Sequence, residues 1–355
     1  MKIWLAGGGT GGHLLPGLAL AEDIQLLAQD AEIGFLGTNE GLDRELLWGT
    51  GYTLKLLAAG RGSPLSWRRP LNAPKFALAL AQAYGLFSKS RPDLVVALGG
   101  YAAAAPGMVA RVLRIPLVIL EQNTVPGRVN RLLSGWAQQI HSQFEEARQY
   151  FRNSPATFHH SGSPLRMPFQ RLAAEPPVHG DAILVMGGSQ GAKRLNEIVA
   201  GAARRIVGET GCVLIHVAGP AHENSIRAAY ATVGVAAEVY GFHNQMDELY
   251  RRSRLVVARS GAVSLAEFAA AGLPAVLVPL PSAMDDHQRL NALSLSLSGA
   301  AVSYEETTAS PDTFAPLVVS LWRDEKRRSA MASAMRETAK PSSGREIAQS
   351  ILTLI

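Results

Sequence analysis

The sequence contains only one cysteine, Cys212, which excludes a disulfide framework and a zinc site built on cysteine ligands. It has no run of the roughly 18–20 apolar residues that a membrane-spanning helix requires. The first residues lead directly into glycines, without the apolar stretch and cleavage site of a signal peptide. Charged residues make up 18% and hydrophobic residues 47%, so a disordered or collagen-like chain is excluded. We expect a folded protein of a reducing cytosol.

The length and the charge distribution indicate two different halves. A chain of 355 residues suits two domains better than one core. The formal charge of +5 lies in residues 1–166, which hold 16 basic and 11 acidic residues, whereas residues 167–355 hold 18 of each. Such an excess favours nucleic acid, an anionic membrane surface or a phosphorylated substrate as partner. Nine basic residues lie between positions 46 and 114, with Asp93 as the sole acid there: Lys55, Arg61, Arg68, Arg69, Lys75, Lys89, Arg91, Arg111 and Arg114.

Short runs of Val, Ile and Leu alternate with helical patterns, which is typical of buried parallel strands in an α/β fold. Residues 2–12 and 182–191 repeat one arrangement, a strand followed by a glycine turn and a helix. We predict two Rossmann-like domains, 1–163 and 164–340, with a last helix at about 341–355 that packs on the first. The expected strands are 3–6, 32–36, 94–98, 117–120, 139–142, 182–186, 213–217, 238–240, 255–258 and 275–278.

The first glycine turn, residues 7–12, fits the pattern G-x-G-x-x-G. A dinucleotide-binding enzyme would have an acid at the end of the second strand, where this chain has Gly37-Thr38. The turn predicts a backbone that a ligand approaches closely, at a helix N-terminus that favours an anion. A tight turn without a ligand is the alternative. His13 follows at once, so either a general-base role or a capping or phosphate-binding role is plausible.

The second half contains two further candidate phosphate sites. The turn at residues 187–191 includes Ser189, whose neighbouring backbone N–H groups suit a pyrophosphate. Arg166 would add positive charge there, unless it is a solvated linker residue. Residues 259–274 predict a strand end, a helix beginning after Ser260-Gly261 and a stop at Gly272. On this helix Glu267 suits two ribose hydroxyls, with a surface acid as the alternative.

Other polar segments also follow predicted strands, where open α/β sheets bind ligands. They lie at 99–101, 121–127 and 284–291, and Gln288 in the last suits sugar hydroxyls. The adjacent pair at 285–286 is weak support for a metal, and we predict none. The helix beginning at Asn72 has an apolar stripe that faces either the core or an anionic bilayer. This stripe consists of Phe76, Leu80, Tyr84 and Phe87.

The motifs together resemble glycosyltransferase family 28, the lipid II-forming N-acetylglucosaminyltransferases of bacterial peptidoglycan synthesis. The resemblance implies a GT-B fold, an α/β architecture of two Rossmann-like domains facing each other across a cleft. It implies inverting transfer of N-acetylglucosamine from UDP-N-acetylglucosamine to the 4-hydroxyl of a lipid-linked muramyl-pentapeptide acceptor, without a cofactor. The enzyme would be peripheral on the cytoplasmic face of the membrane. The motifs are Gly8-Gly9-Thr10-Gly11-Gly12-His13, Gly99-Gly100-Tyr101, Glu121-Gln122-Asn123, Gly187-Gly188-Ser189-Gln190-Gly191 and Arg259 to Glu267.

The same resemblance implies roles for individual residues. His13 is the candidate base, and Tyr101 lies on the acceptor side. The remaining residues would bind the donor: Thr10, Gly11, Gly12 and Asn123 near the sugar, Arg166 and Ser189 at the diphosphate, the main chain of His243 at uracil, Ala262, Val263, Ser264, Leu265 and Ala266 along the phosphate-binding helix, Glu267 at the ribose and Gln288 at the N-acetylglucosamine.

Three alternatives compete with this interpretation. A UDP-N-acetylglucosamine 2-epimerase resembles the same fold but uses no lipid acceptor. A nicotinamide oxidoreductase is disfavoured by Gly37-Thr38. A basic nucleic-acid module lacks any recognisable reader motif, so we expect no nucleic-acid partner.

Overall fold

The protein is described by a computed structural model at residues 1–38, 43–58, 72–176, 180–188 and 191–355. Arg61, Arg68, Arg69 and Ser189 lie outside these ranges. Contacts divide the chain into a first unit, Met1–Arg166 with Ser342–Ile355, and a second unit, Met167–Pro341. The sequence placed this boundary slightly earlier, between 163 and 164. Within the described ranges, no helix is long and apolar enough to cross a membrane.

The first unit is built on a parallel sheet with the described strand order β3-β2-β1-β4-β5-β6-β7. The central strand β1 pairs with β2 on one side and β4 on the other, so the winding direction reverses between β1 and β4. Ligands of open α/β sheets bind at the carboxyl ends of the strands at such a switch point. The strands are β1 (Lys2–Gly7), β2 (Glu32–Thr38), β3 (Thr53–Leu57), β4 (Leu94–Gly99), β5 (Leu117–Glu121), β6 (Gln139–Ser142) and β7 (Thr157–His160).

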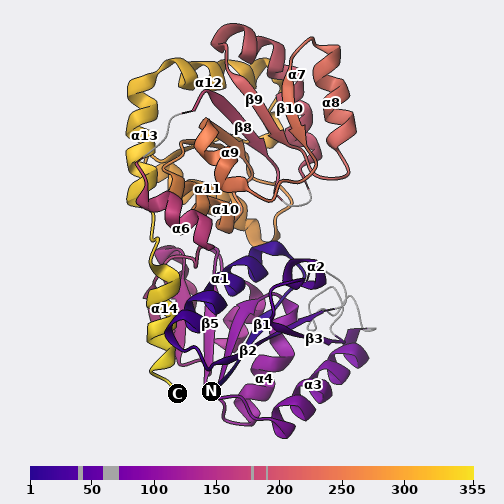
Figure 1. Ribbon diagram of the computed structural model, residues 1–355, viewed down its shortest axis with the longest axis vertical. Helices are drawn as coiled ribbons and strands as arrows, with labels where there is room; N and C mark the ends of the chain where they lie inside the picture. Colours follow the sequence, from indigo (N-terminus) through magenta and orange to yellow (C-terminus); the bar gives the residue numbers. More distant parts are fainter. Residues whose placement is uncertain (39–42, 59–71, 177–179, 189–190) are drawn as a thin grey trace. The chain divides into compact units, whose positions relative to one another are not determined.

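Helices cover both faces of this sheet (Figure 1). On one face α1 packs with the C-terminal helix α14, whose Ile347 and Ile351 share a buried cluster with Leu14 and Ile24. On the other face α3 and α4 contribute Phe87 and several smaller apolar side chains to a second cluster. The helices of the unit are α1 (Gly11–Leu27), α2 (Asp43–Leu47), α3 (Asn72–Lys89), α4 (Ala104–Val112), α5 (Arg128–Leu133) and α14 (Ser343–Leu352), with 3-10 turns at Tyr101–Ala103 and Glu145–Phe151.

The second unit repeats the design with the strand order β10-β9-β8-β11-β12-β13, all parallel in the described residues. Its switch point lies between β8 and β11, which are directly paired. The strands are β8 (Ala182–Met186), β9 (Val213–Val217), β10 (Ala237–Tyr240), β11 (Ser253–Ala258), β12 (Ala275–Leu277) and β13 (Ala301–Ser303).

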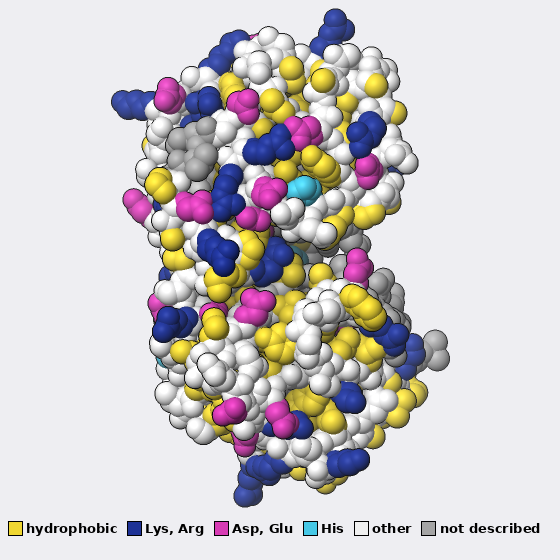
Figure 2. Space-filling view, in the orientation of Figure 1, with side chains coloured by type: hydrophobic (Ala, Val, Ile, Leu, Met, Phe, Trp, Pro, Cys, Tyr) yellow, Lys and Arg dark blue, Asp and Glu magenta, His cyan; other side chains and the backbone are white. Residues whose placement is uncertain are grey.

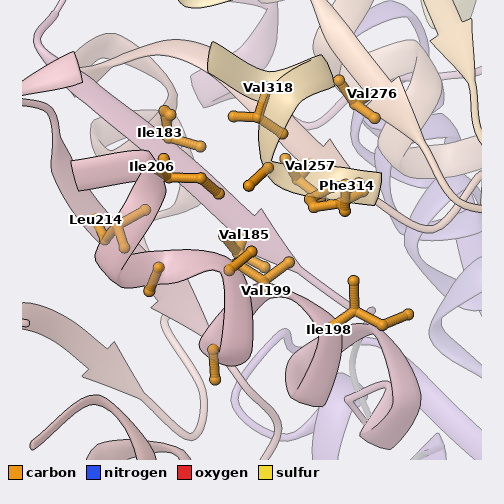
Figure 3. Close-up of a cluster of buried hydrophobic side chains, with 14 of the residues drawn as sticks. Ile183, Val185, Ile198, Val199, Ile206, Leu214, Val257, Val276, Phe314 and Val318 are labelled. Carbon is orange, nitrogen blue, oxygen red and sulfur yellow. The ribbon is translucent and has the colours of Figure 1, made fainter. Parts of the chain in front are cut away.

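The core of the second unit lies between its sheet and two long helices, α7 and α12 (Figure 3). Val185 and Val257 from the strands meet Val199, Phe314 and Val318 from these helices. Each such side chain, when buried, stabilises the folded state by about 1.5–3 kcal/mol. The helices are α6 (Met167–Ala174), α7 (Lys193–Thr210), α8 (Glu223–Thr232), α9 (Met246–Arg252), α10 (Ala262–Ala271), α11 (His287–Leu297), α12 (Pro311–Arg323) and α13 (Glu325–Glu337), with 3-10 turns at Met284–Asp286 and Glu306–Thr308.

All ten predicted strands are present in the described structure, and two Rossmann-like parallel sheets confirm the predicted α/β class. The prediction missed β3, β7 and β13, each of which forms the edge of its sheet. Edge strands face solvent on one side, so they lack the continuous apolar runs that reveal central parallel strands.

Candidate active site

His13 lies in the first turn of α1, directly after the glycine turn that ends β1. Thr10 is the N-cap residue of α1, yet its side chain does not cap the helix. Its Oγ1 lies 3.2 Å from His13 Nδ1 instead. Thr10 is exposed and His13 is half-buried, so the imidazole is held beside a hydroxyl with access to solvent. An imidazole in this setting can accept a substrate proton near neutral pH.

The backbone after β4 packs against the His13 ring. A Cβ added to Gly99 would lie 3.0 Å from His13 Cδ2, and one added to Gly100 would lie 3.3 Å from His13 Nδ1. These glycines have φ values of +101° and +71°, which side chains other than glycine rarely adopt. Tyr101 follows, with its Oη 3.4 Å from the position of a Cβ on Gly9. The β1–β4 switch point therefore brings the predicted residues Thr10, His13 and Tyr101 together.

Gly11 and Gly12 form the first residues of α1, next to Thr10. A Cβ on Gly12 would lie 3.8 Å from Thr10 Oγ1, and Gly12 is exposed. The start of the helix thus presents backbone rather than side chains around the Thr10 hydroxyl.

Glu121, at the end of β5, organises the loop that carries the predicted residue Asn123. Its Oε1 accepts from Asn123 N at 2.9 Å and Nδ2 at 3.4 Å. Its Oε2 accepts from Asn130 Nδ2 at 2.8 Å and Gly127 N at 3.1 Å. Burial raises the pKa of Glu121, and the four donors oppose that rise. The sequence pointed to this loop as a motif but gave no reason to select Asn130, which arrives from α5.

Arg166 ends the N-terminal segment of the first unit, which also includes Ser342–Ile355. Burial and the neighbouring Asp23 raise the pKa of Glu22, and the charge of Arg166 opposes that rise without cancelling it. Arg166 therefore lies near Glu22 of α1. Whether it also meets a diphosphate stays a prediction.

The second glycine turn joins β8 to α7, and its Ser189 lies outside the described residues. Gly191 has a φ of +76°, and a Cβ there would lie 3.0 Å from the carbonyl carbon of Ala218. Gly191 therefore packs closely on the residue that follows β9, and this position requires glycine.

Helix α10 begins where the sequence predicted, with Gly261 as N-cap and Gly272 in the left-handed conformation at its end. The amides in the first turn of a helix have no partner within it and favour an anion. Val263 and Ser264 in this turn are half-buried, as is Ala266. Leu265 is buried, and its N–H donates to Gly261 O at 3.1 Å, so its amide serves the helix itself. Ala262 is buried, so Val263 and Ser264 are the more accessible residues of this first turn.

Glu267 lies one turn further along α10 and is buried. Tyr250 Oη, from α9, donates to Glu267 Oε2 at 2.9 Å. This hydrogen bond holds the Glu267 carboxylate in one orientation. The sequence gave no signal for Tyr250, because the two residues lie on different helices that only the fold brings together.

Gln288 lies at the start of α11, beside the entry to α10. Its Oε1 accepts from Leu280 N at 3.0 Å, while its carbonyl accepts from Ser260 Oγ at 2.7 Å. Asn291 Nδ2 donates to Ser260 O at 3.1 Å. The loop after β12 is therefore tied to the start of α10. The side-chain oxygen of Gln288 is engaged in this state, so a sugar contact would use its amide nitrogen.

Two remaining predictions concern His243 and metal binding. The ring of His243, in the loop after β10, packs on Tyr240 with centroids 4.9 Å apart. Asp286, the N-cap residue of α11, is paired with Arg289 of that helix. The described residues contain no group of three or more His, Cys, Asp or Glu side chains that could hold a metal ion.

The two Rossmann-like units, one with a histidine and hydroxyl cluster and the other with a helix N-terminus and a buried carboxylate, match the architecture of two-domain GT-B glycosyltransferases. The family 28 glycosyltransferase N-terminal domain matches residues 3–142, and the C-terminal domain of that family matches residues 182–349. The chain belongs to glycosyltransferase family 28.

Individual relatives agree with this assignment. The chain is 39% identical to the UDP-N-acetylglucosamine--N-acetylmuramyl-(pentapeptide) pyrophosphoryl-undecaprenol N-acetylglucosamine transferase of Geobacter sulfurreducens, over 96% of this chain and 95% of that protein. It is similar to the crystal structure of Acinetobacter baumannii MurG, with a TM-score of 0.78, 31% identity and 99% of each chain covered. A putative UDP-N-acetylglucosamine 2-epimerase from Listeria monocytogenes has a TM-score of 0.74 at 16% identity, covering 99% and 96% of the two chains, and shares the fold alone.

Proposed function

We propose that this protein transfers N-acetylglucosamine from UDP-N-acetylglucosamine to the 4-hydroxyl of the N-acetylmuramyl sugar of a pyrophosphoryl-undecaprenol-linked pentapeptide. The observation that carries the proposal is the 39% identity to a transferase of that name along 96% of the chain. The epimerase alternative rests on a shared fold at 16% identity.

The reaction requires one nucleophile, one base and one leaving group. The acceptor hydroxyl oxygen attacks the anomeric carbon of the donor sugar, the bond from that carbon to the diphosphate breaks, and the configuration inverts. The hydroxyl proton passes to a base, and UDP leaves with the electron pair of the broken bond. A positioned base and donors aimed at the developing charge lower the barrier.

His13 is the base that the first unit supplies in this proposal. Its half-buried ring lies between Thr10 Oγ1 and the Gly99-Gly100 backbone, which restrict its orientation. Glu121 is another titratable group of the first unit. It is buried and accepts four hydrogen bonds from the protein itself, so it serves to hold the Asn123 loop.

The second unit, with Arg166 of the first, binds the donor in this proposal. The first turn of α10, at Ala262–Ser264, lies at the phosphate, and Glu267, oriented by Tyr250, accepts from the ribose hydroxyls. Ser260 and Gln288 hold the adjoining loop, where the N-acetylglucosamine would lie. Arg166, Ser189 and the main chain of His243 complete the set as sequence-based proposals.

The first unit also supplies a membrane-facing surface in this proposal, formed by α3 and α4. Leu78, Tyr84 and Val112 are 52%, 50% and 70% exposed. Phe87 is fully buried and half-buried Phe76 and Leu80 pack on the core, so only part of the predicted stripe is available. Figure 2 shows Lys and Arg side chains among hydrophobic ones over this region. The exposed basic residues on or beside these helices are Lys75, Lys89, Arg91, Arg111 and Arg114.

Such a surface suits an anionic bilayer, which attracts each nearby basic residue by about 1 kcal/mol. It would place the enzyme at the cytoplasmic face of the membrane, where a lipid-linked acceptor resides.

The activity is tested with labelled UDP-N-acetylglucosamine and a muramyl-pentapeptide pyrophosphate carrying a shortened lipid. We expect a labelled disaccharide product and an equal amount of UDP, both dependent on the acceptor. Formation of the 2-epimer from the donor alone would favour the epimerase and refute the proposal.

A further inference from the structure

Asp43, the first residue of the short helix α2, is a fully buried carboxylate beside the first glycine turn. Its Oδ1 accepts from Gly9 N at 2.7 Å, and its Oδ2 accepts from Thr38 N at 2.8 Å. One side chain therefore joins the turn after β1 to the end of β2, the strand paired with it.

Two glycines make room for this carboxylate. A Cβ on Gly8 would lie 2.9 Å from Asp43 Cγ, and one on Gly37 would lie 3.1 Å away and nearer still to Oδ2. Gly37 occupies the place where a dinucleotide-binding enzyme would carry its acid. In this chain the acid comes from the following helix and points back into the turn. The anion expected at the first glycine turn is thus met, at Gly9, by the protein's own carboxylate.

The residue held by this contact leads directly to the candidate base. Gly9 has a φ of +85° and precedes Thr10, whose Oγ1 lies 3.2 Å from His13 Nδ1. The Tyr101 hydroxyl lies 3.4 Å from the Cβ position of Gly9. Displacement of Gly9 would therefore move the Thr10 hydroxyl away from its position beside His13. It would also change the space between Gly9 and the Tyr101 hydroxyl.

We propose that Asp43 is a positioning residue of the transfer reaction, which fixes Thr10 and His13 through the Gly9 amide without touching substrate. The inference rests on the proposed function. It assigns Asp43 a larger effect on turnover than on donor binding, because most of the predicted donor-binding residues, those of α10 with Gln288, belong to the second unit. A misplacement of about 1 Å in a catalytic group costs roughly 100-fold in rate.

The test compares Asp43→Asn with Asp93→Asn, both in the full chain. Asparagine keeps one acceptor oxygen but turns an NH₂ group toward the second N–H, so one of the two contacts at Asp43 is lost. Asp93 is a matched control, since its Oδ2 accepts from Lys2 N at 2.7 Å at the opposite end of β1. We expect kcat to fall about 10- to 100-fold in Asp43→Asn, with the KM for UDP-N-acetylglucosamine within about twofold of native and an altered pH–rate profile.

Asp93→Asn should keep native kcat and the native pH–rate profile. Native kcat in a folded Asp43→Asn protein would overturn the inference, as would equal losses in both variants. If Asp43→Asn does not fold, Gly37→Ala is the second variant, because its methyl group displaces the Asp43 carboxylate without removing it. Gly37→Ala should show the same loss of kcat, and native kcat in Gly37→Ala would also overturn the inference. Absence of transfer by the native enzyme would instead refute the proposed function, so the two failures are distinguishable.

Discussion

Replacing His216 by glutamine should make the second unit less sensitive to acid. His216 lies on β9 and is fully buried, with Nδ1 2.7 Å from Tyr230 Oη and Nε2 3.1 Å from Asn196 Oδ1. Asn196 Nδ2 donates to Ala218 O at 2.8 Å, so its amide oxygen faces the histidine. Nε2 therefore carries the proton, and Nδ1 accepts from the tyrosine.

The size of the effect follows from the pKa. Burial lowers the pKa of His216 from 6.5 to about 3. The unfolded chain takes up this proton first, so the stability contribution is complete above pH 6.5 and is lost as the pH falls toward 3. Because the unfolded histidine is half protonated at pH 6.5, the slope rises from about 0.7 to about 1.4 kcal/mol per pH unit, which gives a loss of about 2.3 kcal/mol between pH 6.5 and 4.5.

The network also bears on the donor-binding half of the molecule. Ala218, which accepts from Asn196, is the residue against which Gly191 of the second glycine turn packs. Protonation of His216 would disturb the support of that turn. Glutamine offers one donor and one acceptor in place of the two ring nitrogens and cannot be protonated in this range.

Hydrogen exchange of the slowest amides in β8 and β9, corrected for intrinsic rates, measures opening of this unit at each pH. We expect the native protein to lose about 2.3 kcal/mol more than His216→Gln between pH 6.5 and 4.5. His222→Gln, which removes a half-buried histidine of the same unit, should leave the native acid dependence in place. Parallel pH profiles for native and His216→Gln proteins would refute the reasoning, as would a His216 resonance that titrates near pH 6.5.

Three further predictions concern function. Glu267→Gln should weaken UDP binding about 10- to 100-fold by calorimetry, because hydrogen bonds to a charged group contribute about 1.5–3 kcal/mol. The control is Glu238→Gln, which removes an acid paired with Arg252 in the same unit and should leave UDP affinity native. Equal affinities in the native protein and both variants would exclude Glu267 from the donor site. His13→Gln should lower kcat by about 100- to 10,000-fold while leaving UDP affinity native, and an unchanged pH–rate profile would remove it as the base. Tyr84→Ser should reduce binding to anionic vesicles at low salt, whereas Leu297→Ser, at a 78% exposed site in the second unit, should not; binding that ignores the first change would contradict the membrane surface on α3.

The fold was largely predictable because the central strands are buried on both faces. Leu94–Gly99 is fully buried and appears in the sequence as a continuous apolar run. Thr53–Leu57 alternates between exposed and half-buried residues and contains Lys55, so nothing marked it as part of a parallel sheet. Its pairing with β2 is decided by tertiary contacts rather than by local pattern.

The candidate site was predictable where it depends on a turn after a strand, and not where it depends on residues brought from elsewhere. Glycines after predicted strands indicated the positions of His13 and Gly261, because a strand, a turn and a helix follow one another in sequence. Tyr250 and Asp43 act across elements, on Glu267 and Gly9 respectively. A tyrosine or an aspartate in a helix has many possible partners, and only the folded chain selects one.

The two units use a similar strand–turn–helix arrangement for opposite electrostatic tasks. In the first, the buried Asp43 carboxylate already accepts a hydrogen bond from the Gly9 amide, so that amide is not available to a diphosphate. In the proposed reaction an uncharged sugar hydroxyl lies beside Thr10 and His13 instead, and His13 takes its proton. In the second, the N-terminal end of α10, which follows β11, favours a developing negative charge on the leaving diphosphate of the proposed reaction. In this proposal the division of labour between proton removal and leaving-group stabilisation therefore depends on the groups that surround each turn, and not on the strand–turn–helix arrangement that the units share.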